Sequence, residues 1–328
     1  MILSLFRRNR SSVLVLVAIL AALLWSKSII GLDNKIFLFA FDEHDMPIYA
    51  YLIQFVSNPL VLKIIAILLL LIQAFLLIRI YMKHFLIENQ TYLPVLIFIL
   101  TTSSIIPLQR MHPVLLSNIL LIFIIDLLYI SFKAENSLSI YFQAAFYVSV
   151  GSLIYLNFIF FAPIIFISII ILKPYNWRDW IVSIAGLIAP FLILWATYFL
   201  FDIDFNLFIQ QVLNSFDTEK AGKLPIIFVV FLAYIFFLSL LAIHHILLYK
   251  KFKISTRKFY LIFFWFAILN VIIFFSLKSS GIELLLPISI PLSIIISNYL
   301  ISMKKKWLAE VFLILFFILV FLIQILSR

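Results

Sequence analysis

Long apolar segments, separated by short polar breaks, run along the whole chain. A helix that crosses a bilayer needs about 20 mostly apolar residues, and about eleven segments approach that length. The pattern predicts an all-α, polytopic transmembrane helical bundle that forms one integral membrane domain over residues 1–328, with ten spans as the alternative count. The predicted spans are residues 11–31, 58–80, 92–108, 113–132, 140–156, 158–173, 180–201, 224–249, 259–277, 282–302 and 307–326.

The charges of the breaks predict which side of the membrane each loop faces. Cytoplasmic loops of membrane proteins carry an excess of Lys and Arg. Most of the 24 basic residues of this chain lie in alternate breaks, from Arg7 and Arg8 to Lys304 and Lys305, and most of the 14 acidic residues lie in the breaks between them. We therefore expect the N-terminus to be cytoplasmic.

The two longest outer loops, about residues 32–57 and 202–223, each contain apolar residues at helical spacing. Such a stripe predicts an amphipathic helix that lies in the membrane interface rather than across it. We therefore expect two interfacial helices on the outer face. The stripe of the first is Ile48, Tyr51, Leu52 and Phe55, and that of the second is Phe205, Phe208, Ile209, Val212, Leu213 and Phe216.

Composition indicates that lipid is the solvent of this chain, and it excludes several functions. Hydrophobic residues make up 66% and charged residues 12% of the chain, against about 45–50% and 25% in soluble proteins. The net charge of +10 comes from basic residues at span ends, so no nucleic-acid partner is expected. The chain has no Cys, and its 5 Gly form no phosphate-binding loop, so neither a thiolate metal site nor a nucleotide cofactor is expected.

An acidic cluster in the first outer loop is the sharpest candidate for chemistry. It consists of Asp42, Glu43, His44 and Asp45. Carboxylates at a membrane boundary can act as a general base or hold a divalent metal, and we assign a tentative metal pair to Glu43 and Asp45. The alternative is structural, because Asp45 with Pro47 two residues later is typical of a helix N-cap.

Basic residues on the outer face form a second candidate site. Arg110 and His112 precede span four, where an arginine runs against the inside bias, and together they could bind a lipid phosphate. The alternative is that Arg110 snorkels to outer-leaflet headgroups. Lys278 and Glu283 flank the last outer loop, and they either join this site or form a local ion pair.

A few polar residues lie within the predicted spans. Asp126 shares a helix face with Asn118 and Lys133, and an ionisable group at this depth is a functional candidate by default. It either relays protons or pairs with Lys133. Asn157 and Asn270 are expected to form hydrogen bonds between helices.

Two stretches resemble an uncharacterised family of polytopic inner-membrane proteins from Bacteroidota. The first is Asn176-Trp177-Arg178-Asp179-Trp180 with Gly186 and Pro190 following, and the second is the hairpin Gly151–Leu156. The likeness covers most of the chain and implies a bacterial inner-membrane location, but no activity.

The layout is also similar to that of the membrane-embedded (GT-C type) glycosyltransferases, which use polyprenyl-phosphate sugar donors. The shared features are an acidic first outer loop with an interfacial helix, short paired spans that meet near Asn157, and a late span that opens on proline. In that family a first-loop carboxylate is the catalytic base or a metal ligand, and basic outer residues hold the lipid phosphate. The resemblance implies these roles for Asp42, Glu43 or Asp45 and for Arg110 with His112.

The leading functional hypothesis is a glycosyltransferase-like enzyme that acts on a lipid-linked sugar at the periplasmic face. The cytoplasmic loops are too short to bind a nucleotide sugar, whereas a donor already in the membrane needs only an outer groove with a basic rim. The first alternative is a non-enzymatic subunit of an envelope assembly or secretion complex, with membrane-protein partners. The second is a lipid or anion transporter coupled through Asp126, although the internal repeat common in such carriers is absent from the sequence.

Overall fold

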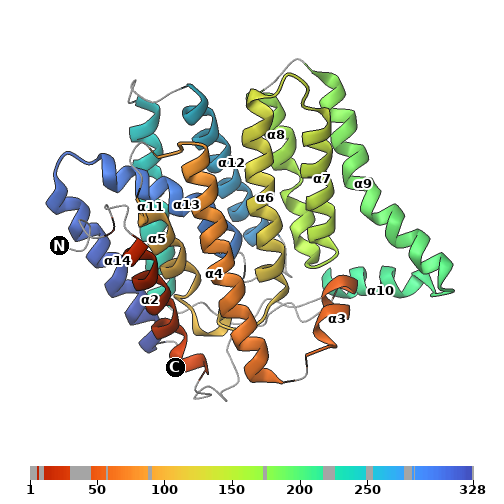
Figure 1. The fold of residues 1–328 in the computed structure, drawn as a ribbon, viewed down its shortest axis with the longest axis horizontal. Coiled ribbons are helices and arrows are strands. Elements are labelled where there is room, and N and C mark those ends of the chain that lie inside the picture. Colours follow the sequence, from red (N-terminus) through yellow and green to blue (C-terminus); the bar gives the residue numbers. More distant parts are fainter. Residues whose placement is uncertain are drawn as a thin grey trace.

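Figure 1 shows the fold of the chain in a computed structural model. The structure describes residues 6, 11–29, 46–56, 58–87, 91–172, 176–216, 226–248, 254–276, 283 and 285–326. Within these residues every regular element is helical, as the apolar periodicity predicts. The elements are α2 (Ser11–Ile29), α3 (Pro47–Ile53), α4 (Pro59–Lys83), α5 (Leu93–Thr102), η1 (Ile106–Leu108), α6 (Pro113–Lys133), α7 (Leu138–Ser152), η2 (Leu156–Phe161), α8 (Pro163–Leu172), α9 (Trp177–Leu200), α10 (Phe205–Phe216), α11 (Ile226–Leu248), α12 (Ile254–Ser276), α13 (Leu285–Ser302) and α14 (Lys306–Leu326).

Six of these helices are long and apolar enough to cross a membrane, namely α4, α6, α9, α12, α13 and α14. Shorter apolar stretches lie within α2, α5, α8 with η2, and α11. Prolines start several helices, because proline at the first helical position sacrifices no intrahelical hydrogen bond. Pro59 and Pro113 are examples, and each follows a capping side chain: Asn58 accepts from the Leu60 amide at 2.9 Å, and His112 from the Val114 amide at 3.2 Å.

The third predicted span is not one continuous helix. α5 ends at Thr102, so its 10 residues are about 15 Å long, half of a hydrocarbon core of about 30 Å. Residues 103–112 continue as irregular backbone around η1. Buried side chains from distant helices hold this backbone: the Trp25 indole donates to the Ser103 hydroxyl at 2.9 Å, and the Gln324 amide to the Ser103 carbonyl at 2.7 Å. Irregular backbone at membrane depth is tolerated where protein buries it.

α7 and α9 form the closest helix pair, and the motif that carries the family resemblance lies between them. The Asp179 carboxylate, at the start of α9, accepts from the Ser137 hydroxyl at 3.0 and 3.1 Å. About two turns further, Gly186 allows the two backbones to approach, because a Cβ there would lie 2.5 Å from the Phe142 carbonyl oxygen. These residues therefore define a packing interface.

The two helices that the sequence predicts as interfacial, α3 and α10, form at one end of the bundle, below α7 (Figure 1). Phe208 of α10 is buried with Met46, Leu153 and Leu156. α3 has only 7 residues, and its N-cap is Met46 without a side-chain cap bond. The expected N-cap at Asp45 is therefore wrong, because proline at position 47 sets the helix start one residue later than that cap requires.

Only part of each predicted apolar stripe is buried. In and directly after α3, Tyr51, Leu52 and Phe55 are exposed, and the interior contact comes from Tyr49 and from Met46 before the helix. A seven-residue helix completes only two turns. Only one face of the helix packs against the bundle, so the other residues of the stripe point away from it. A membrane interface would cover apolar residues in such a position.

Candidate functional site

A buried polar cluster lies at the α3/α10 end of the bundle. Tyr155 stands between α7 and η2, and its hydroxyl donates to the Glu283 carboxylate at 3.2 Å. The Asn157 side-chain amide donates to the same hydroxyl at 3.1 Å. Glu283 and Asn157 are both fully buried. Their short hydrogen-bonded chain places a carboxylate, which is costly to bury, beside donors that stabilise it.

The segment before α6 borders this cluster. The His112 ring meets the Tyr155 ring edge-on, with centroids 6.4 Å apart. The Tyr49 hydroxyl of α3 donates to the Met111 carbonyl at 3.3 Å, and Arg110 lies half-buried just before it. The structure thus brings together His112, Glu283 and Asn157, with Arg110 two residues from His112.

His112 is held as a neutral imidazole. Its Nδ1 accepts the Val114 amide hydrogen, which requires that nitrogen to be unprotonated. Burial, with a smaller contribution from the positive charge of Arg110, lowers the pKa of His112 to about 3. It can therefore act toward a ligand as a neutral hydrogen-bonding group and not as a cation.

We expect the buried neutral His112 to make stability depend on pH. The unfolded chain takes up a proton near the ordinary histidine pKa of 6.5, whereas folded His112 does not. The unfolded state then binds more protons, and stability is lost as the pH falls below 6.5, by about 2 kcal/mol at pH 5. Melting temperatures in detergent should fall between pH 7 and pH 5, and less steeply in His112→Asn. Burial also lowers the pKa of His84, but His84 is present in both the unmodified protein and His112→Asn, so it does not affect the comparison. An equal fall of the melting temperature with pH in the two proteins would contradict this account.

Asn118 connects the cluster to a further helix. Its amide donates to the Leu286 carbonyl at 3.0 Å and to the Gln73 side chain at 3.2 Å. Leu286 lies near the start of α13, three residues after Glu283. Gln73 of α4 and Asn118 of α6 therefore hold the start of α13 in place. Asn118 is therefore a positioning residue of this end of the bundle. Asn270, in contrast, donates within its own helix, to the Phe266 carbonyl, so the expected bond between helices is wrong there.

Several predicted site residues lie outside the described residues. These are Asp42, Glu43, His44, Asp45 and Lys278. The tentative metal pair Glu43/Asp45 and the Lys278–Glu283 ion pair are therefore untested. Among the residues that the structure does describe, no group of three His, Asp or Glu side chains could hold a metal ion.

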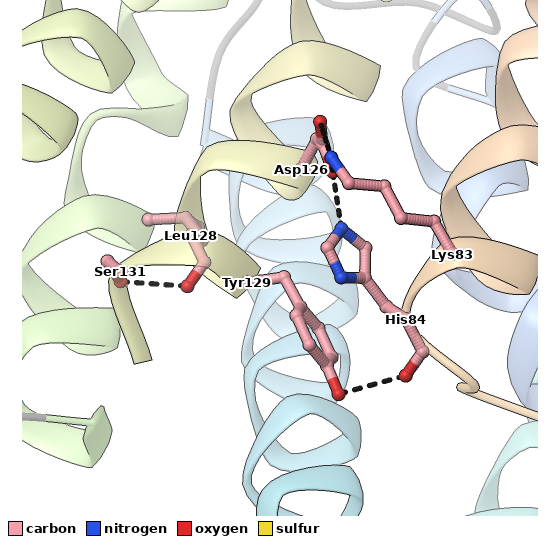
Figure 2. Close-up of polar contacts among 6 residues, drawn as sticks. All are labelled: Lys83, His84, Asp126, Leu128, Tyr129 and Ser131. Atoms are coloured by element: carbon pink, nitrogen blue, oxygen red, sulfur yellow. Dashed lines mark hydrogen bonds and ion pairs between the residues drawn. The ribbon is translucent and has the colours of Figure 1, made fainter. Parts of the chain in front are cut away.

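Asp126 belongs to a different cluster, nearer the other end of α6 (Figure 2). The Lys83 ammonium donates to both carboxylate oxygens at 3.0 Å, and the His84 ring contacts one of them. The predicted partner, Lys133, instead lies 5.5 Å from the Tyr129 ring centroid. The prediction that Lys133 neutralises Asp126 is wrong, because the end of α4 supplies two closer partners, the Lys83 ammonium and the His84 ring. A paired carboxylate favours a structural role over proton coupling.

Sequence reasoning missed Tyr155, Lys83 and His84. A tyrosine at the end of a predicted span is also typical of an interfacial anchor, so Tyr155 carries no signal of its own. Lys83 and His84 read as ordinary inside-facing residues. One signal could have found Lys83 and His84. An intramembrane carboxylate such as Asp126 needs a partner, and basic residues at the end of a neighbouring predicted span can supply it.

Comparison with known proteins places the chain in a family. The model of a family of unknown function (DUF6427) matches residues 29–327, and the chain belongs to that family. This confirms the resemblance to a family without an assigned activity. No curated protein and no solved structure matches the chain.

Proposed function

We propose that this chain is a multi-pass protein of the bacterial inner membrane, with a cytoplasmic N-terminus and the α3/α10 end at the periplasmic face. Six long apolar helices support a membrane location. The orientation rests on the basic residues at the opposite end, such as Lys83 and Lys133. Eleven crossings would include the broken α5 segment and the short α7–α8 hairpin.

We further propose that the polar cluster at the α3/α10 end binds a polyprenyl-phosphate sugar and transfers the sugar to an acceptor. One observation carries this proposal: a fully buried carboxylate, Glu283, is hydrogen-bonded to Tyr155 beside the Arg110–His112 segment. An anionic lipid phosphate needs a cation, and a sugar needs carboxylate and amide acceptors. This end of the bundle offers both groups.

Each residue has a distinct part in the proposed reaction. The guanidinium of Arg110 pairs with the lipid phosphate, and neutral His112 donates a second hydrogen bond. Glu283 accepts hydrogen bonds from sugar hydroxyls. An acceptor hydroxyl attacks the anomeric carbon, the bond to the phosphate oxygen breaks, and a first-loop carboxylate takes the hydroxyl proton. Polyprenyl phosphate leaves as the second product.

Binding of the lipid product gives a direct test. A fluorescent polyprenyl phosphate is titrated into the protein in nanodiscs, and turnover is followed as release of polyprenyl phosphate from a radiolabelled polyprenyl-phosphate sugar. Arg110→Gln should weaken binding about 10- to 100-fold, since a hydrogen bond to a charged group contributes about 1.5–3 kcal/mol.

Arg178→Gln is the matched control, because Arg178 is exposed at the start of α9, at the opposite end of the bundle. It should bind the probe as the unmodified protein does. Equal binding by Arg110→Gln, or no binding by the unmodified protein, would refute the proposed site.

One observation favours a second function, a non-enzymatic subunit of an envelope complex. α9 slants away from the bundle (Figure 1), and only 17% of its most apolar stretch is buried. Leu192, Trp195 and Phe199 lie exposed along it. A partner helix could cover this face as well as lipid does. Stable co-purification of a membrane protein that is lost in Trp195→Ala would favour this function.

A further inference from the structure

A second site is formed at the opposite end of the bundle by the ends of α4, α6 and α12. Three rings from these helices stack in a row: His84 on Tyr129 with centroids 3.9 Å apart, and Tyr129 on Phe259 with centroids 4.2 Å apart. Phe132 meets Phe259 edge-on at 6.3 Å. The stack fixes the helix ends relative to one another, so the charged side chains around it are held at defined positions.

Cations surround this stack in excess of carboxylates. Lys133 lies 5.5 Å from the Tyr129 centroid, and Lys258 lies 5.5 Å from the Phe132 centroid. Lys83 is neutralised by Asp126, and burial lowers the pKa of His84, so that ring adds no charge at neutral pH. No carboxylate among the described residues forms an ion pair with Lys133 or Lys258. Among the described residues, these two positive charges therefore have no carboxylate partner.

The start of α12 adds to this positive potential. A helix N-terminus carries roughly half a positive charge and is stabilised by acidic residues in its first turn. α12 has none there; instead, Arg257 and Lys258 occur within its first five residues. Cations at a helix N-terminus are unfavourable by themselves. An anion bound at this point would compensate the lysines and the helix terminus together.

We propose that Lys133 and Lys258, at the end of α6 and the start of α12, bind the phosphate of an anionic phospholipid headgroup. Basic pockets between membrane helices are suited to this chemistry. Lys133 is exposed and Lys258 is half-buried, and both side chains lie against aromatic rings, as in snorkelling side chains. The proposal depends on the membrane location of the protein but not on glycosyl transfer, because the site lies at the other end of α6 from His112.

Lipid counting by native mass spectrometry tests the proposal on the full chain in non-ionic detergent. Equal concentrations of dioctanoyl phosphatidylglycerol and dioctanoyl phosphatidylcholine are added, and bound lipids are counted. Phosphatidylglycerol should bind preferentially, and the double variant Lys133→Gln/Lys258→Gln should lose on the order of 30-fold in affinity. The variant Lys304→Gln/Lys305→Gln, which alters exposed lysines between α13 and α14, should keep the preference.

Three results would overturn this assignment. The first is equal binding of the two lipids, and the second is an unchanged preference in Lys133→Gln/Lys258→Gln. The third is complete displacement of phosphatidylglycerol by millimolar inorganic phosphate, which would identify free phosphate as the ligand. A double variant that loses the preference while its melting temperature and polyprenyl-phosphate binding stay unchanged supports the lipid site and separates it from the proposed transferase site.

Discussion

Gly186→Val is expected to prevent accumulation of the folded protein. Already the Cβ of alanine would lie 2.5 Å from the Phe142 carbonyl oxygen and 2.9 Å from the Ala145 Cβ, both on α7. The first of these atoms is backbone, so the clash is relieved only by separating α7 from α9. Overpacking of this kind costs about 3 kcal/mol or more. Size-exclusion chromatography of a fluorescent fusion should show loss of the monodisperse peak, with Gly186→Ala intermediate.

The matched control lies on the exposed face of the same helix. Ile184 is 48% exposed, so Ile184→Val should leave the peak and the melting temperature unchanged. A normal peak for Gly186→Val would contradict the close α7–α9 packing. It would also remove the structural explanation for the motif that carries the family resemblance.

Asp45→Asn is expected to abolish glycosyl transfer while the fold stays intact. Removing a general base costs about 10²–10⁴-fold in rate. Asp45 lies outside the described residues, but it is bonded to Met46, which is buried against Leu153 and Leu156 on either side of Tyr155. Met46 is itself the N-cap of α3, so α3 loses no side-chain cap when Asp45 is replaced. The measurement is turnover of a radiolabelled polyprenyl-phosphate sugar beside the melting temperature.

A second aspartate provides the control for this variant. The Asp204 side chain accepts from the Asn206 amide at 2.9 Å and thereby caps α10, and asparagine can replace it in that role. Asp204→Asn should therefore change neither turnover nor melting temperature appreciably. If Asp45→Asn keeps full turnover, the first-loop base is wrong; if it only lowers the melting temperature, Asp45 has a structural role.

The helices were predictable because lipid imposes a simple demand on sequence: long apolar runs with polar ends. The break at Thr102 was not, because the apolar run resumes at Ile105 and the hydropathy of the segment stays high. Tertiary contacts, and not the local sequence, end α5. The Gln324 amide, 221 residues away in the chain, donates to the Ser103 carbonyl, which a continuing helix would satisfy internally. The Trp25 indole, 78 residues away, donates to the Ser103 hydroxyl.

The candidate site was predictable only in part, for a similar reason. Arg110, with His112 nearby, stood out because an arginine in an outer loop runs against the charge bias. Glu283 stood out as a carboxylate beside Lys278, but its described partner is Tyr155, 128 residues earlier. No local pattern encodes that contact. The partner of Asp126 was wrong because spacing along one helix favoured Lys133, whereas packing places Lys83 of α4 at 3.0 Å.

The most direct test of the proposed site is an electron cryo-microscopy structure of the protein in nanodiscs with saturating polyprenyl phosphate. Our account predicts phosphate density at the α3/α10 end, within hydrogen-bonding distance of Arg110 and His112, with the polyprenyl chain extending into the bilayer. Absence of lipid density at that end, or a phosphate bound only elsewhere on the protein, would contradict the account.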